Sequence, residues 1–125
     1  MTFTERDIKL WARMGSSSVF GLVMAELAKE DERLVCLSAD MSRPYALERF
    51  QRACPDRFIN VGIAEENMIG VAAGLAKEGF NVFASSQACF ATTRALDFIK
   101  VNLGYMGLPV KLVGLSAGLE LGEYG

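Results

Sequence analysis

The chain has 125 residues, about half of them hydrophobic, and a formal net charge of −2. This length corresponds to about one domain, long enough to bury a hydrophobic core. The weak charge, without a run of like charges, argues against nucleic acid and against an anionic membrane surface as partners.

The amino terminus and the apolar segments indicate the cellular compartment of the protein. No apolar run reaches the ~20 residues that cross a bilayer, and "MTFTERDIKLWARMG" is too charged for a secretory signal. We therefore expect a cytoplasmic protein. Three cysteines without close spacing suggest neither a disulfide framework nor a metal site, so we expect free thiols. The high apolar content indicates that part of the surface faces a partner.

Helical and strand patterns alternate through the first half of the chain. "SSSVFGLVMAELAKE" (16–30) has the apolar spacing of an amphipathic helix, behind a serine cluster able to cap it. "RLVCLSAD" (33–40) is a nearly continuous apolar run, typical of a strand buried on both faces. A short helix over 45–54 follows Pro44, and 57–61 is predicted as a second strand.

The same alternation continues through the second half. A helix over 65–77 is terminated by Gly79, and 80–85 is the third predicted strand. A helix over 92–103 then leads to a fourth strand over 110–116. This order predicts an α/β fold with a mostly parallel sheet and helices on both faces.

The loops after the predicted strands carry the candidate functional residues. In open α/β sheets, ligands bind beyond the carboxyl ends of the strands. The residues at such places are Asp40, Glu65, Glu66, Gln87, Phe90 and Ser116.

Two adjacent carboxylates, Glu65 and Glu66, open the helix over 65–77. One interpretation is an acidic first turn that satisfies free amides and the helix dipole. The other is a functional carboxylate. Adjacent helical residues diverge by about 100°, so both cannot point into one pocket.

A long segment of the sequence resembles a known family. The stretches "RFINVGIAEENMIGVAAGLAKEGFNVFASSQACFATTRALDFIKVN" and "GLSAGLELGEYG" look like the pyrimidine-binding domain of transketolase, in particular of split enzymes whose carboxy-terminal half is a separate chain. The resemblance assigns 15–125 to this domain and leaves 1–14 as an amino-terminal arm. Family members usually continue beyond "GEYG", so we expect a domain that ends early compared with the family.

The resemblance implies thiamine diphosphate as the cofactor and Glu65 as the catalytic residue. In the family, a carboxyl group at this place hydrogen-bonds N1′ of the aminopyrimidine and favours the imino tautomer, whose 4′ nitrogen takes the proton from thiazolium C2. Such a residue must be able to share a proton in a water-poor site. Glu66 stands where the family usually has glutamine or histidine, and we expect it to face solvent or an interface.

Three further residues are implied to bind the cofactor. Phe90 matches the second of two aromatics that flank the aminopyrimidine, where stacking contributes about 0.5–1.5 kcal/mol, and Gln87 takes the place of the first. A buried core position is the alternative for Phe90. Asp40 matches an acidic residue close to the cofactor across the subunit interface, and it could instead cap the turn before Pro44.

The sequence departs from the family at the substrate and metal sites. It contains no histidine, and the family's catalytic histidine aligns with Ser116, which becomes a possible substrate contact. No glycine–aspartate–glycine and asparagine constellation is present to hold a metal. The resemblance therefore implies that Mg²⁺ or Ca²⁺ is held by a partner domain.

These points lead to one expected function. The chain is expected to be the pyrimidine-binding component of a transketolase-like transferase that moves a two-carbon ketol unit between sugar substrates. It would be active only with an amino-terminal, diphosphate-binding transketolase subunit, as a homo-dimerised heterodimer (a heterotetramer). The alternatives are a subunit like 1-deoxyxylulose 5-phosphate synthase or the 2-oxo acid dehydrogenase beta chain, or a non-catalytic binding subunit of the same fold.

Overall fold

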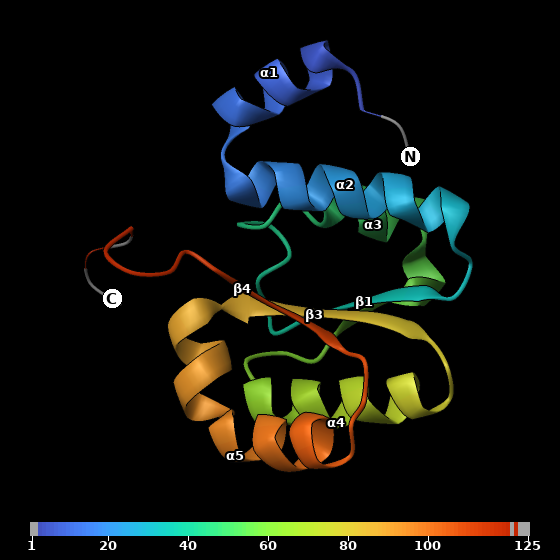
Figure 1. Cartoon of the computed structure of the whole chain (residues 1–125), viewed down its shortest axis with the longest axis vertical. Helices are drawn as coiled ribbons and strands as arrows, with labels where there is room; N and C mark the ends of the chain where they lie inside the picture. The colour runs from blue at the N-terminus through green and yellow to red at the C-terminus, as the bar shows by residue number, and fades with distance from the viewer. Residues whose placement is uncertain (1–2, 121, 123–125) are drawn as a thin grey trace.

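The computed structural model describes residues 3–120 and 122 (Figure 1). Its centre is one parallel sheet of four strands in the order β2-β1-β3-β4. The strands are β1 (Leu34–Ser38), β2 (Phe58–Asn60), β3 (Asn81–Gln87) and β4 (Lys111–Leu115). The predicted parallel sheet is therefore confirmed.

Helices cover both faces of this sheet, also as predicted (Figure 1). On one face lie α2 (Ser16–Glu30) and α3 (Glu48–Ala53). On the other lie α4 (Glu65–Lys77) and a helical segment from Phe90 to Tyr105. Parallel strands must be joined by crossovers of this kind, because a short hairpin would make the next strand antiparallel.

The core is divided into two layers by the alternation of side chains along β1. Val35 and Leu37 pack with α4, whereas Leu34 and Cys36 pack with α2 and α3. All five residues of β1 are buried, as expected for a strand covered on both faces. Each fully buried large apolar side chain contributes about 1.5–3 kcal/mol relative to an exposed one.

The observed structure differs from the single helix predicted over 92–103. The segment starts earlier and consists of η2 (Phe90–Arg94) and η3 (Ile99–Tyr105), both π-helical, on either side of a short α5 (Leu96–Phe98). Apolar periodicity near 3.6 does not distinguish α from π turns over so few residues, so the sequence pattern could not show this. Single π turns inside helices are frequent at functional sites.

Two helix starts also differ from the prediction. The serine cluster does not cap α2: its N-cap is Gly15, at φ +81°, and no side chain caps the helix. The predicted helix over 45–54 begins only at Glu48, because Ala46 has φ +54°, a left-handed conformation that interrupts a right-handed helix.

The amino-terminal arm contains a helix, α1 (Glu5–Met14), which lies on the outer side of α2 (Figure 1). Thr4 and Asp7 form a capping box at its start, which satisfies amides that lack helical partners. None of its residues is buried. The arm thus adds little to the core.

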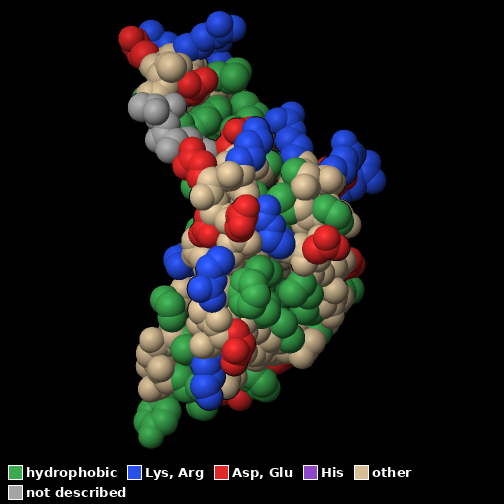
Figure 2. All heavy atoms as spheres, turned by 90° about the vertical axis from the view of Figure 1, so that its right-hand side faces the viewer, with side chains coloured by type: hydrophobic (Ala, Val, Ile, Leu, Met, Phe, Trp, Pro, Cys, Tyr) green, Lys and Arg blue, Asp and Glu red, His purple; other side chains and the backbone are tan. Residues whose placement is uncertain are grey.

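The end of the molecule opposite to the carboxyl ends of the strands is visible in Figure 2. Lysine, arginine, aspartate and glutamate side chains are interspersed over its upper part, and hydrophobic side chains gather in the lower half. This face carries no broad field of one charge.

Candidate active site

The site lies at the carboxyl edge of the sheet, where the crossovers change face. The connection from β1 to β2 passes through α3 on one face, and that from β2 to β3 passes through α4 on the other. The segment from Phe90 to Tyr105, which follows β3, also lies on the α4 face, so the chain leaves the neighbouring strands β1 and β3 toward opposite faces of the sheet (Figure 1). Doubly wound sheets bind ligands at such a switch point.

Glu65 is the buried acidic residue of this edge. It is the first residue of α4, and only 1% of its surface is exposed. Its Oε1 accepts a hydrogen bond from Ser86 Oγ at 3.1 Å, and its Oε2 pairs with Arg94 Nη1 at 2.9 Å. The free amides of the first helical turn also favour a negative group there. Glu66, the next residue, is half-buried.

Arg94 joins Glu65 to the aromatic ring of Phe90. Its guanidinium carbon lies 4.5 Å from the centroid of that ring. The Arg94 side chain is 42% exposed, whereas that of Glu65 is 2% exposed. The pair thus runs from a buried carboxylate to a guanidinium at the surface. Phe90 itself is half-buried at the start of η2.

Gln87 ends β3, beside these residues in sequence but on the other face of the sheet. Side chains alternate along a strand, and Ser86 faces Glu65 on the α4 side. Gln87 therefore points toward the α2 and α3 side. It is 4% exposed, and its Nε2 has no hydrogen-bond partner among the described residues. Such a group costs about 1–3 kcal/mol unless a ligand or water satisfies it.

Asp40 pairs with a residue that the sequence analysis did not select. Its backbone N–H donates to Asn60 Oδ1 at 3.0 Å, and Asn60 Nδ2 donates to Asp40 Oδ1 at 3.1 Å. This pair ties the loop after β1 to the end of β2. Asp40 is exposed. In the turn before Pro44, the side-chain acceptor is Ser38, whose Oγ accepts from the Met41 N–H.

Ser116 follows β4 with φ +55° and is half-buried. It lies near the hydroxyl of Tyr45, which is buried and has no hydrogen bond of good geometry among the described residues. Burial raises the pKa of Tyr45. The structure thus places Ser116 with Tyr45, and the described contacts of Glu65 are with Ser86 and Arg94.

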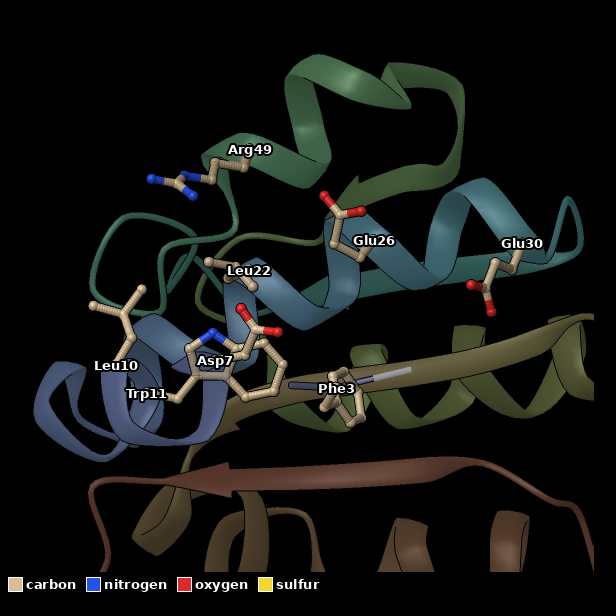
Figure 3. A pocket seen from close by; sticks show the side chains of 8 residues that line it. All are labelled: Phe3, Asp7, Leu10, Trp11, Leu22, Glu26, Glu30 and Arg49. Carbon is tan, nitrogen blue, oxygen red and sulfur yellow. The ribbon is translucent and has the colours of Figure 1, made fainter. Parts of the chain in front are cut away.

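A separate hollow lies between α1 and the helices α2 and α3 (Figure 3). It combines carboxylates with aromatic and aliphatic side chains, and one of these carboxylates, Glu26, is paired with Lys29 at 2.7 Å. No residue of the candidate site lines it. Its lining residues are Phe3, Asp7, Leu10, Trp11, Leu22, Glu26, Glu30 and Arg49.

Within residues 3–120 and 122, no three histidine, cysteine or acidic residues are grouped as a metal site, and no helix is long and apolar enough to cross a membrane. Cys36, Cys54 and Cys89 are free thiols.

Similarity to known proteins agrees with the fold. Residues 13–125 match the family described as transketolase, pyrimidine binding domain. The chain is 45% identical over 111 residues to the "Putative transketolase C-terminal section" of Methanocaldococcus jannaschii, covering 89% of this chain and 35% of that protein. It is 39% identical over 121 residues to a 1-deoxy-D-xylulose-5-phosphate synthase of Clostridium perfringens strain SM101, covering 97% of this chain and 19% of that protein.

A solved structure gives the same result. The chain superposes with a TM-score of 0.71, at 41% identity, on a split-gene transketolase described as an inactive beta4 tetramer, covering 78% of this chain and 32% of that one. The chain therefore belongs to the transketolase pyrimidine-binding domain family. It spans about a third or less of the length of these relatives.

Proposed function

We propose that this chain is the pyrimidine-binding component of a transketolase-like, thiamine diphosphate-dependent transferase that moves a two-carbon ketol unit. The observation that supports this most is the buried carboxylate of Glu65 at the start of α4. It lies at the switch point of the sheet, with Phe90 nearby through Arg94. A buried carboxylate at such a position is a candidate for proton transfer.

The residues present fit the aminopyrimidine part of this cofactor. The ring needs a carboxyl group for N1′ and an aromatic face for stacking, and Glu65 and Phe90 supply these two chemistries. The buried Nε2 of Gln87, on the opposite face of β3 from Ser86, is a further donor without a partner among the described residues. We propose Gln87 and Asp40 as further cofactor contacts at the carboxyl edge of the sheet.

Glu65 would share a proton with ring atom N1′. Ser86 holds one oxygen of this carboxylate, which fixes the orientation of the group, and the surrounding burial excludes water. When bound, thiamine diphosphate supplies the thiazolium C2 carbon that carries the ketol unit. Glu65 is therefore the residue of this chain to which we assign the acid–base role.

A partner subunit is part of the proposal. The chain covers about a third or less of the length of each of these relatives. One of them is named as the C-terminal section of a transketolase. We propose that an amino-terminal subunit holds the diphosphate and its Mg²⁺ or Ca²⁺, and that two such heterodimers associate. Sugar substrates would bind at the joint site, with Ser116 as a possible contact.

A second candidate is favoured by the similarity to 1-deoxy-D-xylulose-5-phosphate synthase, which extends over 97% of this chain. That activity would release carbon dioxide from a 2-oxo acid, whereas ketol transfer between sugars releases none. Analysis of the products separates these two. A non-catalytic subunit is a third candidate, because the chain has no histidine.

The test is to combine the chain with the candidate amino-terminal subunit, thiamine diphosphate and Mg²⁺. We expect cofactor binding by calorimetry and accelerated exchange of the C2 proton by NMR in the mixture, and neither with the amino-terminal subunit alone. Binding without accelerated exchange in any mixture would instead indicate a non-catalytic subunit.

A further inference from the structure

Arg94 occupies a position in this site to which neither the sequence nor the family relation assigned a role. Its Nη1 is 2.9 Å from Glu65 Oε2, and its Cζ is 4.5 Å from the centroid of the Phe90 ring. A single side chain thus contacts both of the groups to which we assigned the aminopyrimidine ring.

The chemistry of a guanidinium explains why one group can do this. It is planar, it stacks on aromatic faces, and it donates N–H groups to carboxylates in its own plane. A bound aminopyrimidine would present a flat face to Phe90 and a ring nitrogen to Glu65. The guanidinium and the ring therefore compete for the same carboxylate oxygen and the same aromatic ring.

The difference in exposure shows which partner can move. Glu65 is buried in the first turn of α4, where a carboxylate left without a partner is costly. The Arg94 side chain is 42% exposed, so its guanidinium can turn into water without crossing the core. Arg94 also belongs to the π-helical turn η2.

We propose that Arg94 occupies the aminopyrimidine place in the free chain, and that the ring displaces its guanidinium from Glu65 on binding. This inference rests on the proposed function. In the free chain, Arg94 then supplies the hydrogen-bond partner of the buried carboxylate. We call this paired state closed. Only molecules in the open state bind the ring, so the apparent affinity for the ring falls as the closed fraction rises.

The experiment titrates the full chain with 4-amino-2-methylpyrimidine-5-methanol, the aminopyrimidine ring without thiazolium or diphosphate, and follows binding by NMR. The variants are Arg94→Ala and Arg94→Gln. Arg94→Gln retains an N–H donor for the buried Glu65, so this variant should fold even if Arg94→Ala does not. Arg33→Gln is the matched control, because Arg33 also lies over an aromatic ring, that of Phe80 at 5.8 Å, and donates to the Glu78 carbonyl at 2.9 Å.

We expect the dissociation constant for the ring to fall roughly three-fold or more in both Arg94 variants, because neither alanine nor glutamine carries the guanidinium that covers Phe90 while it pairs with Glu65. It should stay unchanged in the Arg33 control. In the unmodified chain, the side-chain N–H signals of Arg94 should shift toward those of a solvated arginine as the ring saturates.

Two results would overturn the inference alone: ring binding that is equal or weaker in both Arg94 variants, or Arg94 signals that stay unchanged at saturation. No ring binding in any variant would also overturn the inference. The C2 proton exchange of the assembled mixture then decides separately whether the proposed function holds, since it tests the function without reference to Arg94.

Discussion

Burial controls the chemistry of single side chains in this chain, and Cys36 is the simplest case. It lies in β1, fully enclosed between the two helical layers. Burial raises the pKa of its thiol from the ordinary value of 9.0 to about 12, because a thiolate is poorly stabilised away from water.

We therefore predict that Cys36 resists an aromatic disulfide reagent at mildly alkaline pH, whereas the half-buried Cys54 and Cys89 react. A count of released thiolate should show two accessible thiols in the native chain and a third only after unfolding. Replacement of Cys36 by serine should leave the native count unchanged. Equal reaction rates for all three thiols would contradict this.

The same shift predicts how stability depends on pH. The pKa of Cys36 is raised in the folded chain, so the unfolded chain loses its thiol proton first as the pH rises. The contribution is fully present below pH 9.0 and is lost as the pH approaches about 12. Cys36→Ser should reduce this alkaline loss in melting experiments.

Glu65 could be selected from the sequence as a candidate, whereas Arg94 could not. The strand end and the acidic helix entrance pointed to Glu65 and Glu66 alike, and the family resemblance selected Glu65. The structure buries Glu65, while Glu66 is less enclosed. Arg94 is 29 residues away from Glu65 in the chain, and an arginine in a helix usually faces solvent. The four-residue spacing from Phe90 was the one available signal, because such residues share a helix face.

At the scale of elements, local signals predicted α4 fully and α2 in its extent. An acidic first turn and a following glycine marked both ends of α4. The start of α3 and the π turns after β3 escaped prediction, because they depend on the left-handed Ala46 and on packing against the sheet. Long-range packing of this kind leaves little trace in local periodicity.

Gly21 in α2 shows such a long-range requirement. A Cβ at this position would collide with the backbone carbonyl of Ala46 in the loop after β1. We predict that Gly21→Ala lowers the free energy of unfolding by roughly 1–3 kcal/mol, as expected for overpacking. Denaturant titration measures this change.

Gly74 in α4 is the matched control for that substitution. A Cβ there meets no atom within 4 Å, so Gly74→Ala should be neutral or stabilise the chain by about 0.5–1 kcal/mol through helix propensity. A destabilisation of equal size in both variants would show that the contact with Ala46 is not the cause.

At the scale of the whole molecule, hydrophobic side chains remain exposed on the helical segment after β3. Leu96, Val101 and Tyr105 are 60%, 57% and 90% exposed, and Phe98 and Val101 line a hollow there. The sheet also has two edges, at β2 and β4. Such surfaces favour association, in agreement with the apolar composition.

We predict that the chain is larger than a monomer at tens of micromolar, by light scattering coupled to size exclusion. Val101→Lys should shift it toward the monomer without lowering the melting temperature, because Val101 is outside the buried core. Leu10→Lys, at a 53% exposed position on α1, is the control and should leave the size unchanged. A stable monomer of the unmodified chain, with a cooperative melt, would refute the prediction.

The central claim is that Glu65 exchanges a proton with the aminopyrimidine ring, and C2 proton exchange of thiamine diphosphate in the assembled mixture tests it most directly. Glu65→Gln keeps the size of the side chain and an acceptor oxygen for Ser86 or Arg94. We predict that it slows the exchange by a factor on the order of 10² or more, with the fold intact by circular dichroism. Glu66→Gln, one position along the same helix, should have a far smaller effect. Small and equal effects of the two substitutions would contradict the assignment of Glu65 and the function proposed here.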